Sequence, residues 1–484
     1  MVGVDAVRRR HFARLQVSLV RGVASAVGTL FAAALSTSPA WADTVQSALV
    51  DAYKGNPQLN VQRAIARQTD EQVPQALSGY RPHIGATATL GIQSLSTTQK
   101  ITPTPPGAPA QYFTNNGENL PYSVGITAVQ NVFNGFQTAN RTRAAESQVS
   151  AAQATLRNTE ITVLLNALTA YMNVLRDQAT VELYKRNVVV LKEELRETRD
   201  RFRVGDVTAT DISQAESRLA GAETLLLTGE ANYQASTAAY QQVIGHKPGK
   251  LAPASPVDRF IPGTLEQALA IIDQHPAVVT AMYAVDFADL QVKIAEGALM
   301  PQLNLQASAQ KAWEPQLDIP QTSSLSAVAQ LTMPIYQGGA EYSAVRQNKE
   351  TIGQRLIELD QARRQVRQAI LQAWGQVAAT KMQISSTQMT VKTAEQALNG
   401  VREEARIGER TTLDVLNAEQ ELVNARVQVV TAEHDRVVAS YTLLAAIGRL
   451  LPEVLKLPLA VYDPQVHYHQ VRDTWRGLRT PDGK

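Results

Sequence analysis

Two short segments of the sequence place an acidic side chain three residues after a threonine. The first pair is Thr208 and Asp211, and the second is Thr411 and Asp414. This spacing is typical of a capping box, and an acid in the first helical turn is also stabilised by the helix dipole. Asn417 lies three residues after Asp414 and therefore shares its helix face. The sequence predicts two helix starts, each with a fixed negative charge.

Other candidate sites lack residues that their chemistry needs. The segment 245–250 suggests a phosphate-binding loop, but it is one residue too short and Leu251 follows where Ser or Thr is required. His467 and His469 could bind a metal together, but no third ligand stands out. No Ser-His-Asp order or pair of acids indicates an enzyme. We therefore expect no catalytic residues, no metal and no cofactor.

Glycines with a constant separation show that the chain contains an internal repeat. Three pairs are each 203 positions apart: Gly135 and Gly338, Gly205 and Gly408, Gly245 and Gly448. A fixed offset means that element lengths are preserved between the copies, so the unit is repeated for its geometry. We expect Gly205 and Gly408 to reverse the chain between antiparallel helices. We expect Gly135, Gly338 and Gly339 to relax bends where strands lead into helices.

The first 42 residues have the composition of an export signal. Five arginines precede a short apolar run, Val23–Leu35, and Ala40-Trp41-Ala42 has the pattern of a cleavage site. The apolar run is too short for a membrane-spanning helix, which needs about 20 residues, so a membrane anchor is the weaker alternative. The expected domains are a signal peptide (1–42), a first repeat (43–263), a second repeat (264–450) and a C-terminal tail (451–484).

Composition excludes several classes of partner and site. The precursor has 46 basic and 44 acidic residues, and the signal accounts for five arginines and one aspartate, so the mature chain carries about two net negative charges. That balance lacks the excess of basic residues that is typical of nucleic-acid-binding proteins. Cysteine is absent, which excludes a disulfide framework and a lipid-carrying cysteine.

Four segments alternate between apolar and small polar residues, as strands with two different faces do. They are Ile84–Gln93, Tyr122–Ala128, Gln302–Gln310 and Leu325–Met333. Their length fits a tilted membrane-spanning strand with its apolar face toward lipid. A small soluble sandwich is the alternative, but it would bury larger residues than alanine and carry charges on its wet face. We expect the connecting segments 94–120 and 311–324 to be polar loops.

The remaining sequence predicts unusually long helices. Residues 137–203 contain no Pro or Gly and residues 340–407 contain no Pro, so each helix is on the order of 100 Å long. Residues 208–244 and 411–447 have coiled-coil spacing and are expected to pack back against them. Residues 44–80 also have a helical pattern. The chain is therefore expected to be mainly α, with two long helical hairpins.

Four strands cannot form a closed barrel in a membrane, because the smallest membrane barrels have about eight strands. The two edges of an open sheet cannot remain in hydrocarbon, where each unpaired backbone group costs several kcal/mol. The strands must therefore be shared with other copies of the chain. This argument requires two or more copies and leaves their number open.

Taken together, these features resemble the outer-membrane efflux protein family, that of TolC. The resemblance covers residues 44–448 and is carried by the two tip motifs, Arg203-Val204-Gly205-Asp206 and Arg406-Ile407-Gly408-Glu409, each followed by an Asp-containing helix start. The surroundings of 203–216 look most like the type I secretion branch. The resemblance implies a homotrimer in the outer membrane of a Gram-negative bacterium, with a twelve-strand β-barrel among outer-membrane lipids and a twelve-helix periplasmic tunnel.

The resemblance also implies roles for individual residues. Asp414 and Asn417 match positions that line the periplasmic entrance as acidic rings, which would favour cations. Asn417 replaces an acid, so this entrance should be less negative. Arg410 and Asp211 match links that close the tips, while Ala405 stands where an aromatic residue is often found. Simple helix capping is the alternative role for both acids.

The implied function is a passive exit duct for efflux or type I secretion. Its implied partners are a periplasmic adaptor (membrane fusion) protein and an inner-membrane transporter, either ABC-type or proton-driven. A periplasmic coiled-coil adaptor or scaffold is the alternative, but it leaves the charge-free strands unexplained. A periplasmic enzyme is a third hypothesis, disfavoured because no catalytic constellation stands out.

Overall fold

The structure is a computed structural model that describes residues 43–101, 109–481 and 483. The predicted export signal lies outside the described residues. The helices are α1 (Val45–Gly55), α2 (Pro57–Asp70), α3 (Gln72–Leu77), α4 (Gln137–Arg203), α5 (Ala209–Ile244), α6 (Leu265–Ala270), α7 (Pro276–Gly297), α8 (Ala340–Arg406), α9 (Thr412–Ala446) and α10 (Pro464–Val471). The strands are β1 (His83–Leu90), β2 (Gln93–Ile101), β3 (Gln111–Asn119), β4 (Tyr122–Asn134), β5 (Gln302–Gln316) and β6 (Ile319–Thr332).

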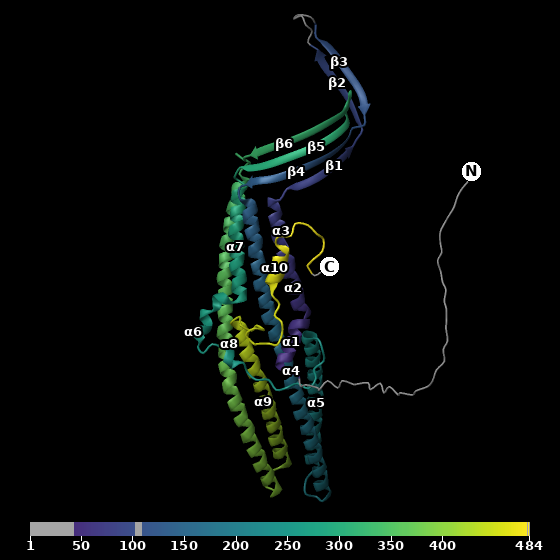
Figure 1. The fold of residues 1–484 in the computed structure, drawn as a ribbon. Helices are drawn as coiled ribbons and strands as arrows, with labels where there is room; N and C mark the ends of the chain where they lie inside the picture. The colour runs from purple at the N-terminus through teal and green to yellow at the C-terminus, as the bar shows by residue number, and fades with distance from the viewer. Residues whose placement is uncertain (1–42, 102–108, 482, 484) are drawn as a thin grey trace, which may run out of the picture. The chain divides into compact units, whose positions relative to one another are not determined.

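The two long helices predicted from the sequence are confirmed, and α4 and α8 each contain 67 residues. Helix α5 packs along α4 and α9 along α8, while α7 lies against both long helices (Figure 1). The largest apolar core lies midway along the helices and contains the buried rings of Tyr53, Tyr171 and Tyr240. Among the described residues, no helix is both long and apolar enough to cross a membrane.

The four predicted strands form one antiparallel sheet in the order β1-β4-β5-β6. Strands β4 and β5 pair along almost their whole length, with Ala128 opposite Ala307, and so join the two repeats. Strands β1 and β6 are the edges, and each has a partner on one side only. In Figure 1 this sheet lies at one end of the long helices, and the two hairpin turns lie at the other end.

For the residues that the structure describes, the prediction that 94–120 and 311–324 are loops was wrong. Strands β2 and β3 pair as a second sheet within the first segment, and β5 and β6 continue through the second as far as the turn at Leu317 and Asp318. Strands β2 and β3 pair through their backbones, and side-chain hydroxyl groups add to this pairing, with those of Thr98 and Thr114 2.9 Å apart. Such polar cross-strand pairs stabilise a hairpin without an apolar face, so an alternation of hydrophobicity does not reveal it.

The backbone bends sharply where the sheet leads into the long helices. Gly135 has a φ of 64°, and Gly338 and Gly339 have φ values of 74° and 87°, in the left-handed region that favours glycine. Phe136, which matches Gly339 in the first repeat, also has a positive φ of 61°. Gly135 lies against the backbone of Gly297 at the end of α7, where no side chain could fit.

Candidate functional site

Each hairpin turn ends its long helix with a glycine in the left-handed conformation. Gly205 has a φ of 81° and Gly408 a φ of 84°. The N–H of Asp206 donates to the carbonyl of Arg201 at 3.0 Å, and the matching bond in the second turn measures 2.9 Å. This pattern is a Schellman motif, which satisfies carbonyls that the helix end leaves free. The two turns therefore have the same geometry, as the repeat predicts.

The capping boxes predicted at the starts of α5 and α9 are present. The carboxylate of Asp211 accepts from the N–H and the hydroxyl of Thr208 at 2.8 and 2.7 Å. The carboxylate of Asp414 accepts the same two bonds from Thr411 at 3.0 and 2.8 Å. These bonds favour the charged form, so the pKa of each acid lies below its ordinary value; the Thr208 hydroxyl is the main cause for Asp211 and the Thr411 N–H for Asp414.

The structure does not bring Arg410 and Asp211 together within one chain. The guanidinium of Arg410 binds the carboxylate of Glu404 at 2.8 Å, inside its own hairpin. Asp211 binds Thr208, also inside its own hairpin. Among the described residues no hydrogen bond or ion pair joins the two, so any closing link between them requires another chain.

Asn417 has a contact that sequence reasoning did not anticipate. Its side-chain oxygen accepts a hydrogen bond of 2.6 Å from the guanidinium of Arg218, which joins α9 to α5 across the two hairpins. A comparison of the two repeats could have drawn attention to Arg218, because the residue that matches it in the second copy has the opposite charge, Glu421. The polar residue at position 417 therefore has a structural partner within the chain.

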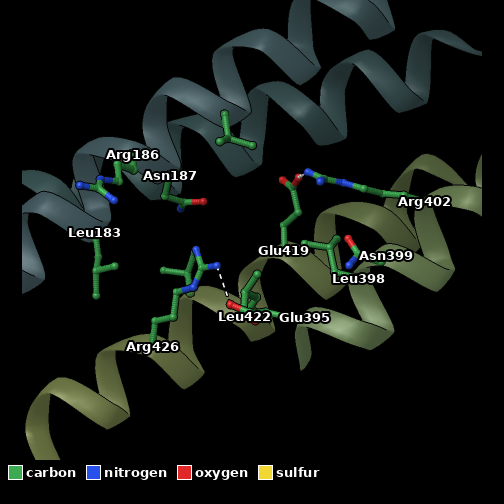
Figure 2. A pocket seen from close by; sticks show the side chains of 12 residues that line it. Leu183, Arg186, Asn187, Glu395, Leu398, Asn399, Arg402, Glu419, Leu422 and Arg426 are labelled. Atoms are coloured by element: carbon green, nitrogen blue, oxygen red, sulfur yellow. Dashed lines mark hydrogen bonds and ion pairs between the residues drawn. The ribbon is translucent and has the colours of Figure 1, made fainter. Parts of the chain in front are cut away.

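A second charged cluster, also missed from the sequence, lies farther from the turns. Arg402 of α8 pairs with Glu419 of α9 (Figure 2). The guanidinium of Arg402 also lies 3.9 Å from the carboxylate of Glu194 on α4. The matching pair in the first repeat is Arg199 and Glu216, at 2.6 Å. The fixed offset of 203 residues relates the two pairs and could have identified both.

Burial distinguishes these two matched ion pairs. The side chain of Glu216 is 50% exposed, whereas that of Glu419 is only 4% exposed. One carboxylate oxygen of Glu419 has no hydrogen-bond partner among the described residues. Burial is the main cause that raises the pKa of Glu419 and of Glu194, and it outweighs the opposing effect of Arg402 on each of them.

Glu419 and Arg402 line a cleft of about 340 Å³ between the two hairpins. Leu183, Leu398 and Leu422 form its apolar part, and Arg426 pairs with Glu395 at its rim at 2.8 Å (Figure 2). In the part of the chain that the structure describes, no group of three His, Cys, Asp or Glu side chains could hold a metal ion. The cleft therefore offers a surface of mixed polarity between the two hairpins.

Comparison with known proteins decides the family. The model of the outer membrane efflux protein family matches residues 48–246 and 267–449, one match for each repeat. The chain belongs to this family. It is therefore a transport protein of the Gram-negative outer membrane and not an enzyme, which also excludes the alternative of a periplasmic adaptor or scaffold.

Individual relatives agree with this assignment. The chain is 40% identical to the outer membrane efflux protein BepC of Brucella suis biovar 1 (strain 1330) over 464 residues, which cover 96% of this chain and 97% of BepC. It is 23% identical to the outer membrane protein TolC of Escherichia coli (strain K12), covering 84% of this chain and 83% of TolC. The fold is similar to that of the Campylobacter jejuni CmeC outer membrane channel, with a TM-score of 0.71, 16% identity and 89% of each chain covered.

The buried carboxylate of this efflux family member predicts a pH dependence. Because the folded-state pKa of Glu419 is raised, its contribution to stability is fully present below the unfolded-state pKa and is lost as pH rises through the folded-state pKa. We expect hydrogen-exchange protection of the amides of residues 416–422, corrected for intrinsic rates, to fall as the pH rises above the ordinary glutamate pKa of 4.5. The variant Glu419→Gln, which is neutral throughout, should reduce this change.

Glu216→Gln is the matched control, since it changes the equivalent but exposed carboxylate in the first repeat. It should leave the pH dependence in α9 intact. An identical pH dependence in the wild type and in Glu419→Gln would contradict the assignment to Glu419.

Proposed function

We propose that three copies of this chain form a continuous duct, with a twelve-strand barrel in the outer membrane and a twelve-helix tunnel in the periplasm. The observation that carries the proposal is the four-stranded sheet with two unpaired edges, β1 and β6, set on two equal helical hairpins. Backbone groups at such edges need partners within a membrane. Edge-to-edge pairing of identical chains supplies these partners and leaves none unpaired once the ring closes.

The side chains of the sheet support its place in lipid. Ile84 and Leu90 on β1, and Leu325 and Leu331 on β6, are large apolar residues that are exposed in the single chain, with Leu325 87% exposed. An apolar band of this kind is typical of the outer face of membrane barrels. The small polar residues between them, such as Ser326, would then face the lumen.

The duct acts passively, with energy supplied by an inner-membrane transporter of the ABC or proton-driven type and coupling supplied by a periplasmic adaptor. Residues 245–250, the one segment that suggested a phosphate loop, follow the end of α5, whereas a phosphate loop lies between a strand and a helix. Tripartite efflux and type I secretion both use such a duct. The named relative BepC, an efflux protein, supports the first of these uses.

The proposed gate lies at the hairpin tips and uses the four polar residues identified above. Asp414 and Asn417 line the entrance, and Asp211 and Arg410 form closing links between neighbouring chains. Capping and gating are compatible for Asp414, because both of its capping bonds go to the same oxygen, Oδ2. The other oxygen, Oδ1, is left for cations in a ring of three.

Asp414→Asn tests the ring separately from the cap. The amide oxygen of asparagine can still accept the Thr411 bonds, while the charge is removed. In planar bilayers we expect the ratio of cation to anion permeability to fall severalfold and block by multivalent cations to weaken.

Glu341→Gln is the control for this change, since Glu341 is also an acid in the first turn of a helix but lies at the sheet end of α8. It should leave both properties unaltered. An unchanged current–voltage profile in Asp414→Asn would leave capping as the sole role of Asp414.

Arg410→Ser and Asp211→Asn test the closing links. Each removes one charge from the proposed inter-chain contacts, so the closed state should loosen and the conductance at rest should rise. The same recordings measure this, with Arg203→Ser as the control because Arg203 pairs with Asp200 inside its own helix. If neither variant conducts more than the wild type, the closing role is refuted.

The absence of cysteine allows a direct test of the trimer. Thr87→Cys on β1 is combined in turn with cysteine at Ser324, Ser326 or Val328 on β6. Within one chain these strands are three spacings apart, about 14 Å, which is too far for a disulfide. Oxidation should therefore link neighbouring chains and produce a covalent trimer as the largest species on a denaturing gel. Monomer alone, or a ladder beyond three, would contradict the proposed assembly.

A further inference from the structure

The C-terminal tail, residues 451–484, has no role in the duct as described so far, yet it is held firmly to the helices. Helix α10 lies along α2 (Figure 1). His467, which is largely buried, binds the fully buried carboxylate of Asp70 at 2.8 Å. Arg472, the next residue after α10, lies 3.6 Å from Glu146 on α4. The tail therefore has a fixed course up to this point.

Beyond α10 the tail reaches the beginning of the sheet. The guanidinium of Arg81, two residues before β1, donates to the carbonyl of Thr474 at 3.0 Å. The same guanidinium lies over the ring of Trp475, 4.5 Å from its centre. Arg81 thus holds Trp475 beside the end of a strand that the proposed duct places in the membrane.

The residues presented at this position are unusual for a surface in water. Trp475 is 70% exposed and Leu478 is fully exposed. Arg476 follows Trp475 in the sequence, and Arg479 follows Leu478. Both arginines are exposed and form no ion pair among the described residues. The segment 472–479 therefore combines two large apolar side chains with two unpaired cations, Arg476 and Arg479.

Other exposed aromatic residues lie at the same end of the sheet. Tyr80 precedes β1, Phe136 follows β4 and Tyr336 follows β6, and each is more than half exposed. Aromatic belts at this depth are typical of membrane proteins, because an amphipathic ring is stable at the boundary between lipid and water. Trp475 is near the C-terminus of the sequence, but its contact with Arg81 places it at this same end of the sheet.

We propose that residues 472–479 are an interfacial anchor that binds anionic phospholipid headgroups of the periplasmic leaflet. Trp475 and Leu478 enter the headgroup region, while Arg476 and Arg479 bind lipid phosphates. Anionic lipid is the occupant that matches both features, since it offers an apolar layer and negative charge side by side. The inference rests on the proposed function in one respect, that the sheet spans the membrane.

The three tryptophans outside the signal allow a test with its own controls. Trp313 stacks on Tyr122 near the opposite end of the sheet, and Trp374 packs against the helical core. Three full-chain variants each retain one tryptophan, with the others replaced by phenylalanine, and are reconstituted in bilayers that contain brominated lipid, with and without phosphatidylglycerol. Fluorescence quenching should occur for Trp475 and Trp313 but not for Trp374, and phosphatidylglycerol should increase it for Trp475.

Arg476→Ser/Arg479→Ser, in the variant that retains Trp475, should raise severalfold the fraction of phosphatidylglycerol needed for half-maximal quenching. Arg364→Ser/Arg367→Ser is the control, since it removes the same charge from the middle of α8, away from the sheet. If a tryptophan variant fails to fold, Trp475→Cys carrying a polarity-sensitive label in the otherwise native, cysteine-free chain gives the same information.

The outcomes separate this inference from the duct itself. Quenching of Trp313 without quenching of Trp475 would overturn the anchor and leave the duct intact. The same result is expected if a neighbouring chain or another protein covers the tail. Absence of quenching at both positions would refute the membrane-spanning sheet and the anchor together. Quenching of Trp475 that is independent of phosphatidylglycerol and of the arginines would overturn recognition of anionic headgroups.

Discussion

The free backbone groups at the two edges of the sheet need hydrogen-bond partners, and most of the architecture follows from this need. In the duct proposed above, the free N–H and C=O groups of β1 and β6 lie in hydrocarbon with no water to bind, so each edge must meet another edge. A ring of sheets can close only if every chain contributes the same width and tilt. The helices below must then match in length and register around the ring. Two helices of 67 residues, separated by a constant offset, satisfy that condition within one chain.

Duplication gives two helical hairpins of nearly equal length. Small differences between the two copies mark candidate functional positions. The Schellman turns and capping boxes are the same in both hairpins, because any change there would alter where the helices end. The matched ion pairs differ instead in burial: Glu216 is half exposed, whereas Glu419 is buried in a helix that packs against α4. Among the described residues, the hydrogen bond from Arg218 to Asn417 has no counterpart in the other copy. These candidate contacts between the hairpins lie where the two repeats differ.

The sequence was sufficient for features determined by local rules. Helix length followed from the absence of proline, the turns from paired glycines, and the capping boxes from the spacing of Thr and Asp. It was insufficient where the deciding contact is distant or polar. Strands β2 and β3 lack an apolar face, so periodicity did not distinguish them from loops. The burial of Glu419 depends on the position of α4, more than 200 residues away in the chain, and the binding of the tail by Arg81 joins residues nearly 400 positions apart.

The pKa values of two acids in α9, Asp414 and Glu419, are shifted in opposite directions, so the two groups gain and lose charge in different pH ranges. Hydrogen bonds from Thr411 lower the pKa of Asp414, whereas burial raises that of Glu419, five residues farther along the same helix. As pH falls from neutral, Glu419 and Glu194 take up protons while Asp414 keeps its charge. The capping bonds and the negative charge at the start of α9 then persist, because Asp414 stays ionised. The contact between hairpins changes first, because it depends on a buried carboxylate whose pairing with Arg402 only partly offsets the loss of solvation. One helix can thus keep a constant charge at its start and still allow the packing between hairpins to respond to protons.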